Sequence, residues 1–148
     1  MRDIVLAENL PKASGVKGTA AVASLSNFRQ PKGDAKTGAR VRNCLLHIPS
    51  YEFDDGVCKE LCRSGGALLF SFSDILREKG FRRGIVISKM RLALASCRKA
   101  GCGYAVCTLA RNANETRNAR ELESFMSVLG MDQHERKFAG ETSERLVA

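Results

Sequence analysis

A short basic segment with a glycine at its centre has the residue types that bind phosphate groups. Backbone N–H groups at the start of a helix bind anions, because the helix dipole places partial positive charge there. A glycine lets the backbone approach such a ligand closely, and guanidinium groups make paired contacts with phosphate oxygens. We therefore expect an anion-binding helix start formed by Phe81, Arg82, Arg83, Gly84, Ile85 and Val86.

This segment and three later landmarks resemble the coenzyme A-binding half of the GNAT N-acetyltransferases, over about residues 67–139. Residues 81–86 look like the cofactor loop of that family, and Gly101-Cys102 stands where the following helix closes. Asn112 and Asn114 match its Asn-rich strand exit, and residues 125–131 are similar to its Phe-Tyr-x-x-Leu-Gly-Phe helix ending. The resemblance implies acetyl-CoA as cofactor, bound by residues 81–86, Asn112 and Asn114.

The resemblance further implies an acetyl- or acyl-CoA-dependent N-acyltransferase, or a catalytically lapsed relative. Its acceptor would be an amine on a small molecule or a protein. Phe81 and Val86 depart from the family loop at its first and last positions, and Met126 replaces a tyrosine whose hydroxyl often supplies a proton, which a thioether cannot do. Asp74, just beyond a strand expected at 67–72, is the candidate catalytic base.

A zinc site is the alternative chemistry. Cys44-x2-His47 and Cys58-x3-Cys62 each have a workable ligand spacing, and together they could supply three thiolates and one imidazole. A CxxH pair within a strand points to opposite faces, so buried or incidental thiols compete with this interpretation. The regular series Cys97, Cys102 and Cys107 is interpreted as core packing.

The charge balance favours an anionic partner. The chain has 24 basic and 16 acidic residues, a net charge of +8, and residues 77–99 hold eight bases against one acid. The basic cluster could meet a phosphate-bearing cofactor or a nucleic acid. The competing function is therefore a basic nucleic-acid-binding or assembly protein, with or without zinc.

Length and composition predict one globular domain over residues 1–148. Its N-terminal half (1–66) is rich in expected strands, the expected cofactor-binding half covers 67–139, and 140–148 is expected to form a tail or an edge strand. No apolar run reaches the roughly 18 residues of a membrane span, and the N-terminus lacks the pattern of a secretory signal. We expect a cytoplasmic protein with reduced cysteines and no membrane partner.

The expected elements are an α/β fold with a mixed, mostly antiparallel sheet. A first strand is expected at 4–7, and 19–25 with 41–48 suggests a hairpin across turn residues at 30–38. Strand, helix, strand, helix then follow: 67–72, a helix from about 84 to a C-cap at Gly101, 104–109, and a helix capped by Asn114 that ends at Gly130. The tail 134–148 is expected to form a hairpin through Gly140 or to fray.

Overall fold

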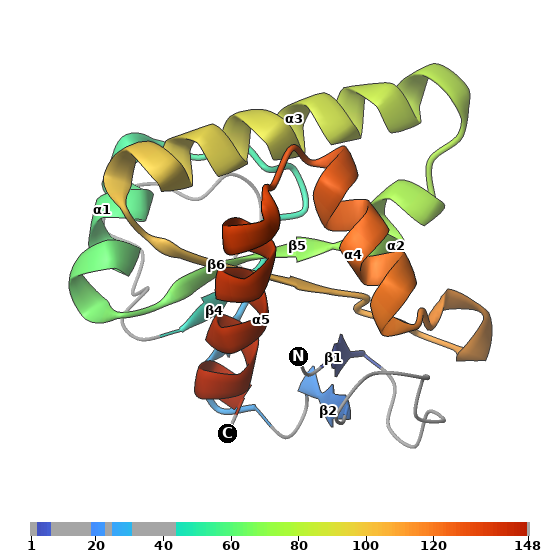
Figure 1. The fold of residues 1–148 in the computed structure, drawn as a ribbon, viewed down its shortest axis with the longest axis horizontal. Helices are drawn as coiled ribbons and strands as arrows, with labels where there is room; N and C mark the ends of the chain where they lie inside the picture. The colour runs from blue at the N-terminus through green and yellow to red at the C-terminus, as the bar shows by residue number, and fades with distance from the viewer. Residues whose placement is uncertain (1–2, 7–18, 23–24, 31–43, 148) are drawn as a thin grey trace.

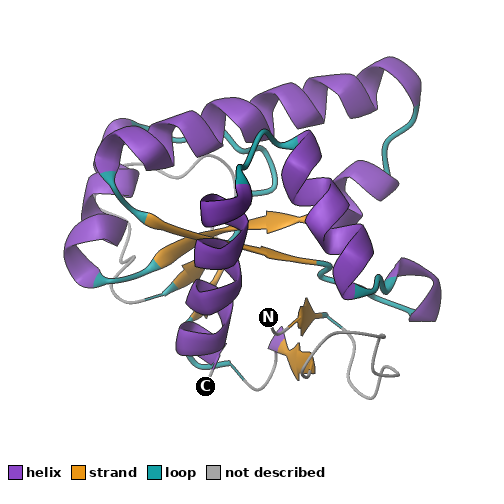
Figure 2. Ribbon diagram, in the orientation of Figure 1, coloured by secondary structure: helices purple, strands orange, loops and turns teal. Residues whose placement is uncertain are grey.

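The computed structural model describes residues 3–6, 19–22, 25–30 and 44–147 as an α/β fold. Figure 1 shows a sheet covered by α3 and α1 on one side and crossed by α5, with the two N-terminal strands beyond its end. Figure 2 shows the same view by secondary structure. The strands are β1 (Asp3–Val5), β2 (Thr19–Ala21), β3 (Phe28–Arg29), β4 (Leu45–Leu46), β5 (Ala67–Ser71) and β6 (Gly103–Cys107). The helices are α1 (Asp55–Ser64), α2 (Phe72–Leu76), α3 (Gly80–Ala100), α4 (Ala119–Val128) and α5 (Gln133–Val147), with a 3-10 turn, η2 (Ala113–Glu115).

The strands form two parallel sheets, β1-β2 and β3-β4-β5-β6, which corrects the expected antiparallel arrangement. The expected hairpin between 19–25 and 41–48 is wrong for the described residues, because β2 pairs with β1 while β4 pairs with β3 and β5. Most of its turn, and residues 41–43, lie outside the described residues. Helices α1 and α3 connect successive strands, and such crossovers make neighbouring strands parallel.

The smaller sheet continues the larger one at the end of β6. The Leu109 N–H donates to the Ile4 carbonyl at 2.8 Å, and the Leu6 N–H donates to the Ala110 carbonyl at 2.9 Å. Asp3 anchors this junction, because its carboxylate accepts hydrogen bonds from the Thr108 N–H at 2.7 Å and the Thr108 hydroxyl at 2.6 Å. Strand β1 is therefore hydrogen-bonded to a segment that lies more than a hundred residues further along the chain.

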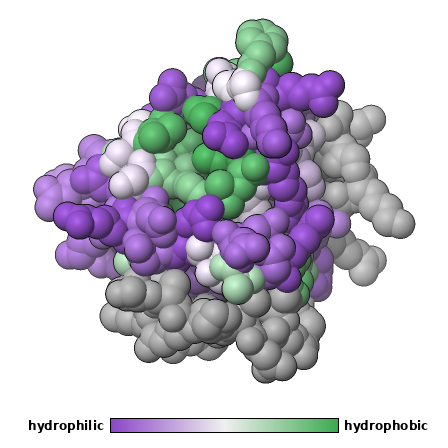
Figure 3. Space-filling view, turned by 90° about the vertical axis from the view of Figure 1, so that its right-hand side faces the viewer, coloured by the Kyte–Doolittle hydropathy of each residue, from purple (hydrophilic) through white to green (hydrophobic). Residues whose placement is uncertain are grey.

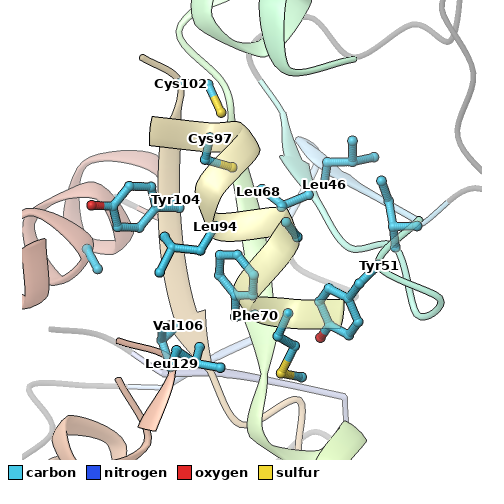
Figure 4. Packing of buried hydrophobic residues seen from close by; sticks show 14 of the residues in the cluster. Leu46, Tyr51, Leu68, Phe70, Leu94, Cys97, Cys102, Tyr104, Val106 and Leu129 are labelled. Atoms are coloured by element: carbon cyan, nitrogen blue, oxygen red, sulfur yellow. The ribbon is translucent and has the colours of Figure 1, made fainter. Parts of the chain in front are cut away.

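Both faces of the central sheet are buried, as a parallel sheet requires. Leu46, Leu68 and Phe70 face one cluster, which Figure 4 shows packed with Leu94 and Leu129. The alternate residues face a second cluster, formed by Ile4, Leu45, Ala67, Leu69, Ala105, Cys107, Leu109 and Leu146. All five residues of β5 are buried, which confirms the buried strand expected at 67–72.

Helix α1 explains a segment whose pattern is weak in the sequence. The Asp54 side chain caps it by accepting the Val57 N–H at 3.1 Å, and Gly65 ends it in the left-handed region with φ 78°. Gly66 then passes so close to its neighbours that a Cβ there would lie 2.8 Å from the Cys44 carbonyl oxygen and 2.8 Å from Leu61 Cδ2. The turn from α1 into β5 thus depends on two adjacent glycines.

The C-terminal segment is one helix, not a hairpin or a frayed tail. Helix α5 runs from Gln133 to Val147 and includes Gly140. Its buried face is Ala139, Thr142, Ser143 and Leu146. Across the described part of the chain, the helices are too short or too polar to span a bilayer.

Candidate functional site

The carboxyl ends of β4, β5 and β6 gather polar residues from three loops. In parallel α/β sheets this edge is the usual place for ligands, because several loops meet there. His47 follows β4, Asp74 lies in the short helix after β5, and Thr108 follows β6. Figure 3 views the molecule from this side, where apolar side chains form a hollowed centre surrounded by hydrophilic ones.

Asp74 is the centre of a hydrogen-bonded group. His47 Nε2 lies 2.8 Å from Asp74 Oδ2, and the Tyr51 hydroxyl donates to the same oxygen at 2.5 Å. The Ser71 N–H donates to the Tyr51 hydroxyl at 3.0 Å. Burial raises the pKa of Tyr51 well above its usual value, and the nearby Asp74 charge adds to this shift. The phenol therefore keeps its proton and holds the carboxylate in place.

His47 has one ring nitrogen without a partner. Its Nε2 faces a carboxylate, so Nε2 carries the proton in the neutral tautomer and Nδ1 is left as an acceptor. Nδ1 is buried and accepts no hydrogen bond within the described part of the chain. His47 therefore serves to hold Asp74 through Nε2.

A second acid lies beside Asp74. Arg77 is 3.9 Å from Asp74 Oδ1 and 3.7 Å from Glu115 Oε2, so one guanidinium lies between two carboxylates. Glu115 Oε2 also accepts from the Arg111 N–H at 2.9 Å and from the Ser73 hydroxyl at 3.4 Å. Asp74, the sequence-predicted catalytic base, is thus held by three side chains.

The predicted cofactor loop is part of a helix. Helix α3 begins at Gly80, so Gly84, Ile85 and Val86 lie in its second turn, where their amides bond within the helix. This corrects the expected helix start at Gly84. Within residues 80–86 the glycine with a left-handed backbone is Gly80, with φ 55°, and a Cβ added at Gly84 would contact nothing within 4 Å.

The remaining predicted cofactor residues lie at the start of α3 and in η2 with its N-cap. Phe81 and Arg82 are exposed on the first turn of α3, while Arg83 Nε donates to the Ile75 and Glu78 carbonyls and ties α3 to α2. Asn112 caps η2 by accepting the Asn114 N–H at 3.0 Å. Asn114 therefore does not cap α4; Asn118 does, in a reciprocal pair with Glu121.

A groove of about 530 Å³ lies elsewhere on the described surface. Residues of α4 and α5 line it, among them Glu123, Glu141 and Glu144 against Arg136 and Lys137. A site with more acids than bases does not suit a pyrophosphate, because like charges repel it. The structure thus gives no support to acetyl-CoA binding.

The predicted zinc ligands do not come together as a set. Among the described residues, the His, Cys and acidic side chains close enough to share a metal ion are Cys58, Cys97 and Cys102, whose ligand atoms all lie within 4.8 Å of one another. Hydrogen bonds from Cys102 and Cys97 lower the pKa of Cys58 to about 4. These three buried cysteines could bind a metal.

Sequence reasoning assigned two of those cysteines to core packing. Cys97 and Cys102 belong to the series with Cys107, but Cys107 faces the opposite side of the sheet, in the second cluster. A pair of cysteines on either side of a glycine helix end was the signal that could have identified them, since such a turn brings its flanks together.

Comparisons with known proteins add no assignment. No protein-family model matches the chain, and no significant match is found among curated proteins.

Proposed function

We propose that this protein binds single-stranded nucleic acid through the first turn of α3 and the neighbouring carboxyl edge of the sheet. The observation that carries the proposal is Phe81, a large aromatic side chain that is 85% exposed and is followed by two arginines. Exposing a large apolar ring to water is unfavourable, so such a side chain is expected to have a binding partner. Every nucleic-acid base offers a face on which it can stack.

The charges around Phe81 suit a phosphate backbone. Lys79 and Arg82 are exposed, and neither has a carboxylate partner among the described residues. The first turn of α3 contains no acid, and no side chain caps it. The amides of that turn and the helix dipole add to the positive potential. Aromatic and cationic groups interleaved on one exposed turn are typical of surfaces that bind single strands.

Further cations lie in the loop after β6 and in the first turn of α4. Arg111 and Arg120 are exposed, and Arg117 lies over the Phe72 ring at 5.5 Å from its centre. Other cations of the basic cluster are engaged elsewhere: Lys89 pairs with Glu52 at 2.7 Å and Arg98 with Glu135 at 2.6 Å. Lys79 and Arg82, at the N-terminal end of α3, have no such ion pair among the described residues.

The N-acyltransferase function implied by the sequence stays a prediction. The amides that would cradle the pyrophosphate bond within α3, and the cationic edge also fits a nucleic acid, whose phosphates need no closed pocket. The exposure of Phe81 favours the nucleic-acid function, because an exposed aromatic side chain can stack on a base.

The test measures binding of a fluorescently labelled single-stranded RNA to the full chain. Fluorescence anisotropy gives the binding constant K at several salt concentrations. We expect log K to fall with log salt, with a slope of about −0.7 for each phosphate contacted. Phe81→Ala should cost about 1–3 kcal/mol of binding free energy. Arg82→Ala should make the salt slope shallower by the amount that corresponds to one phosphate contact.

Matched controls separate this surface from the rest of the chain. Leu92 is 70% exposed on the same helix, about 16 Å from Phe81 along the axis, so Leu92→Ala should leave binding unchanged. Arg63, on α1, has a side chain that is 78% exposed. Arg63→Ala removes a cation outside the proposed surface, so it should leave RNA binding unchanged. Equal losses for Phe81→Ala and Leu92→Ala would sink the proposal. A thermal shift with coenzyme A, and none with RNA, would instead support the acyltransferase.

A further inference from the structure

Three sulfur atoms from distant parts of the chain converge in the core. Cys58 lies on α1, Cys97 in the last turn of α3, and Cys102 two residues beyond that helix. Their Sγ atoms all lie within 4.8 Å of one another, and the three side chains are buried and free of disulfides. The remaining buried cysteines, Cys44 and Cys107, do not belong to this group.

The end of α3 brings two of these sulfurs together. Gly101 adopts the left-handed conformation, with φ 72°, and its N–H bonds to the Arg98 carbonyl. The Cys102 N–H then bonds back to the Cys97 carbonyl at 3.1 Å, which completes a Schellman turn. This turn folds residue 102 over residue 97. Because the turn is fixed by backbone hydrogen bonds, the two thiols are held close before any ligand arrives.

Helix α1 supplies the third sulfur and places a fourth nearby. Cys58 lies on its buried face, with Val57 and Leu61. Cys62 is one helical turn further along the same side, and its thiol donates to the Gly101 carbonyl at 3.5 Å. Cys62 is exposed, so it lies between the buried sulfurs and the solvent. An ion could therefore enter past Cys62.

We propose that Cys58, Cys97 and Cys102 bind one zinc ion, with Cys62 as the fourth ligand. Zn–S bonds of about 2.3 Å put the sulfurs of a tetrahedral thiolate site about 3.8 Å apart, and the sulfurs of Cys58, Cys97 and Cys102 already lie within 4.8 Å of one another. Thiolate ligands select soft metal ions, and a site closed by four of them is structural. Each thiol releases its proton to solvent when its sulfur binds the metal.

The site has a mechanical role in the fold. It would join α1 to the end of α3 and to the start of β6, three segments otherwise held by packing and by the turn at Gly101. Because the metal binds only the folded arrangement, its binding free energy adds to the stability of the fold. The site lies at the opposite end of α3 from Phe81, so it is independent of the proposed nucleic-acid surface.

Titration of the reduced, metal-free full chain with Co²⁺ tests the proposal. We expect one cobalt per chain, a thiolate-to-cobalt charge-transfer band, the visible absorption of tetrahedral cobalt, and displacement by one equivalent of Zn²⁺. Zinc should raise the melting temperature by several degrees, and a chelator should reverse the rise. Cys62→Ser should bind cobalt at least tenfold more weakly, with altered visible bands.

Matched cysteine variants decide which sulfurs bind. Cys102→Ser should abolish the charge-transfer band, while Cys44→Ala, at another buried free cysteine, should keep it. If the wild-type chain shows neither the band nor a thermal shift with zinc, the proposal is wrong whether or not the variants fold. Equal loss in Cys44→Ala and Cys102→Ser would also overturn it. An unchanged cobalt spectrum in Cys62→Ser would remove Cys62 as the fourth ligand.

Discussion

The Tyr51 hydroxyl donates to Asp74 Oδ2 at 2.5 Å and accepts the Ser71 N–H at 3.0 Å. One phenol therefore connects the loop after β4 to the end of β5 and to α2. Tyr51 itself has a left-handed backbone, with φ 54°, which is unusual for a non-glycine residue. Strain of this kind persists only when surrounding contacts hold the residue, and here they include a stacked Phe70 ring.

Tyr51→Phe should destabilise the fold by about 1–3 kcal/mol, because the Asp74 carboxylate and the Ser71 N–H each lose a buried partner. The stacking on Phe70 is kept, so the loss reports on the hydroxyl. Urea denaturation of the two proteins measures the difference. A Tyr51→Phe protein as stable as the wild type would contradict this role.

Gly66→Ala should destabilise by about 1–3 kcal/mol or more. The new Cβ would lie 2.8 Å from a backbone oxygen, which cannot move away without shifting the start of β4. The measurement is the midpoint of thermal or urea unfolding. Gly80→Ala is the comparison. Its added Cβ would meet no neighbour within 4 Å, so any loss of stability there reports only the strain of a positive φ.

Gly84→Ala should stabilise the protein by up to about 1 kcal/mol. Gly84 is exposed within α3, has no neighbour in contact with an added Cβ, and alanine is the better helix former. RNA affinity should be unchanged, because the Gly84 amide bonds within the helix. A fall in stability or in RNA binding would show that close approach of the backbone matters at this position.

Glu135 gives the fold a pH dependence on the acid side. Hydrogen bonds from Arg98 lower its pKa below the usual value, so the charged form is favoured in the folded state. The stabilisation is therefore present above the unfolded pKa, near 4.5, and is lost as the pH falls through the lower folded pKa. Glu135→Gln should cost no more than about 1 kcal/mol near pH 7, since Arg98 is partly exposed, and the difference should vanish in strong acid. Urea midpoints measured from pH 3 to 7 check this, and high salt should reduce the effect.

Local sequence signals predicted several elements of the C-terminal half of the fold. The strand at β5, the helix end at Gly101 and the strand at β6 are confirmed, because buried apolar runs and a glycine cap are strong local features. Helix α5 was missed for a physical reason. Its buried face uses Ala139, Thr142 and Ser143, which are small or polar, so hydropathy does not mark it.

Pairing between strands and contacts across the chain were harder to predict. Nothing local in 19–25 or 41–48 tells a parallel from an antiparallel partner, because that choice depends on which helices intervene. The candidate sites show the same limit. Asp74 was chosen from its position after a strand, whereas the partners of Cys58 lie 39 and 44 residues further along the chain, at Cys97 and Cys102. Rules based on ligand spacing identify a metal site only when its ligands come in pairs that are close together in the sequence.

The bond between Asp3 and Thr108 has a consequence for the order in which the chain folds. A contact that closes a loop of 105 residues gains little until the intervening strands are in place, so β1 is expected to dock after β4, β5 and β6 have assembled. Asp3→Ala should then accelerate unfolding in stopped-flow measurements and leave the refolding rate nearly unchanged. A strand that is synthesised before the central ones would thus be among the last to reach its native neighbours.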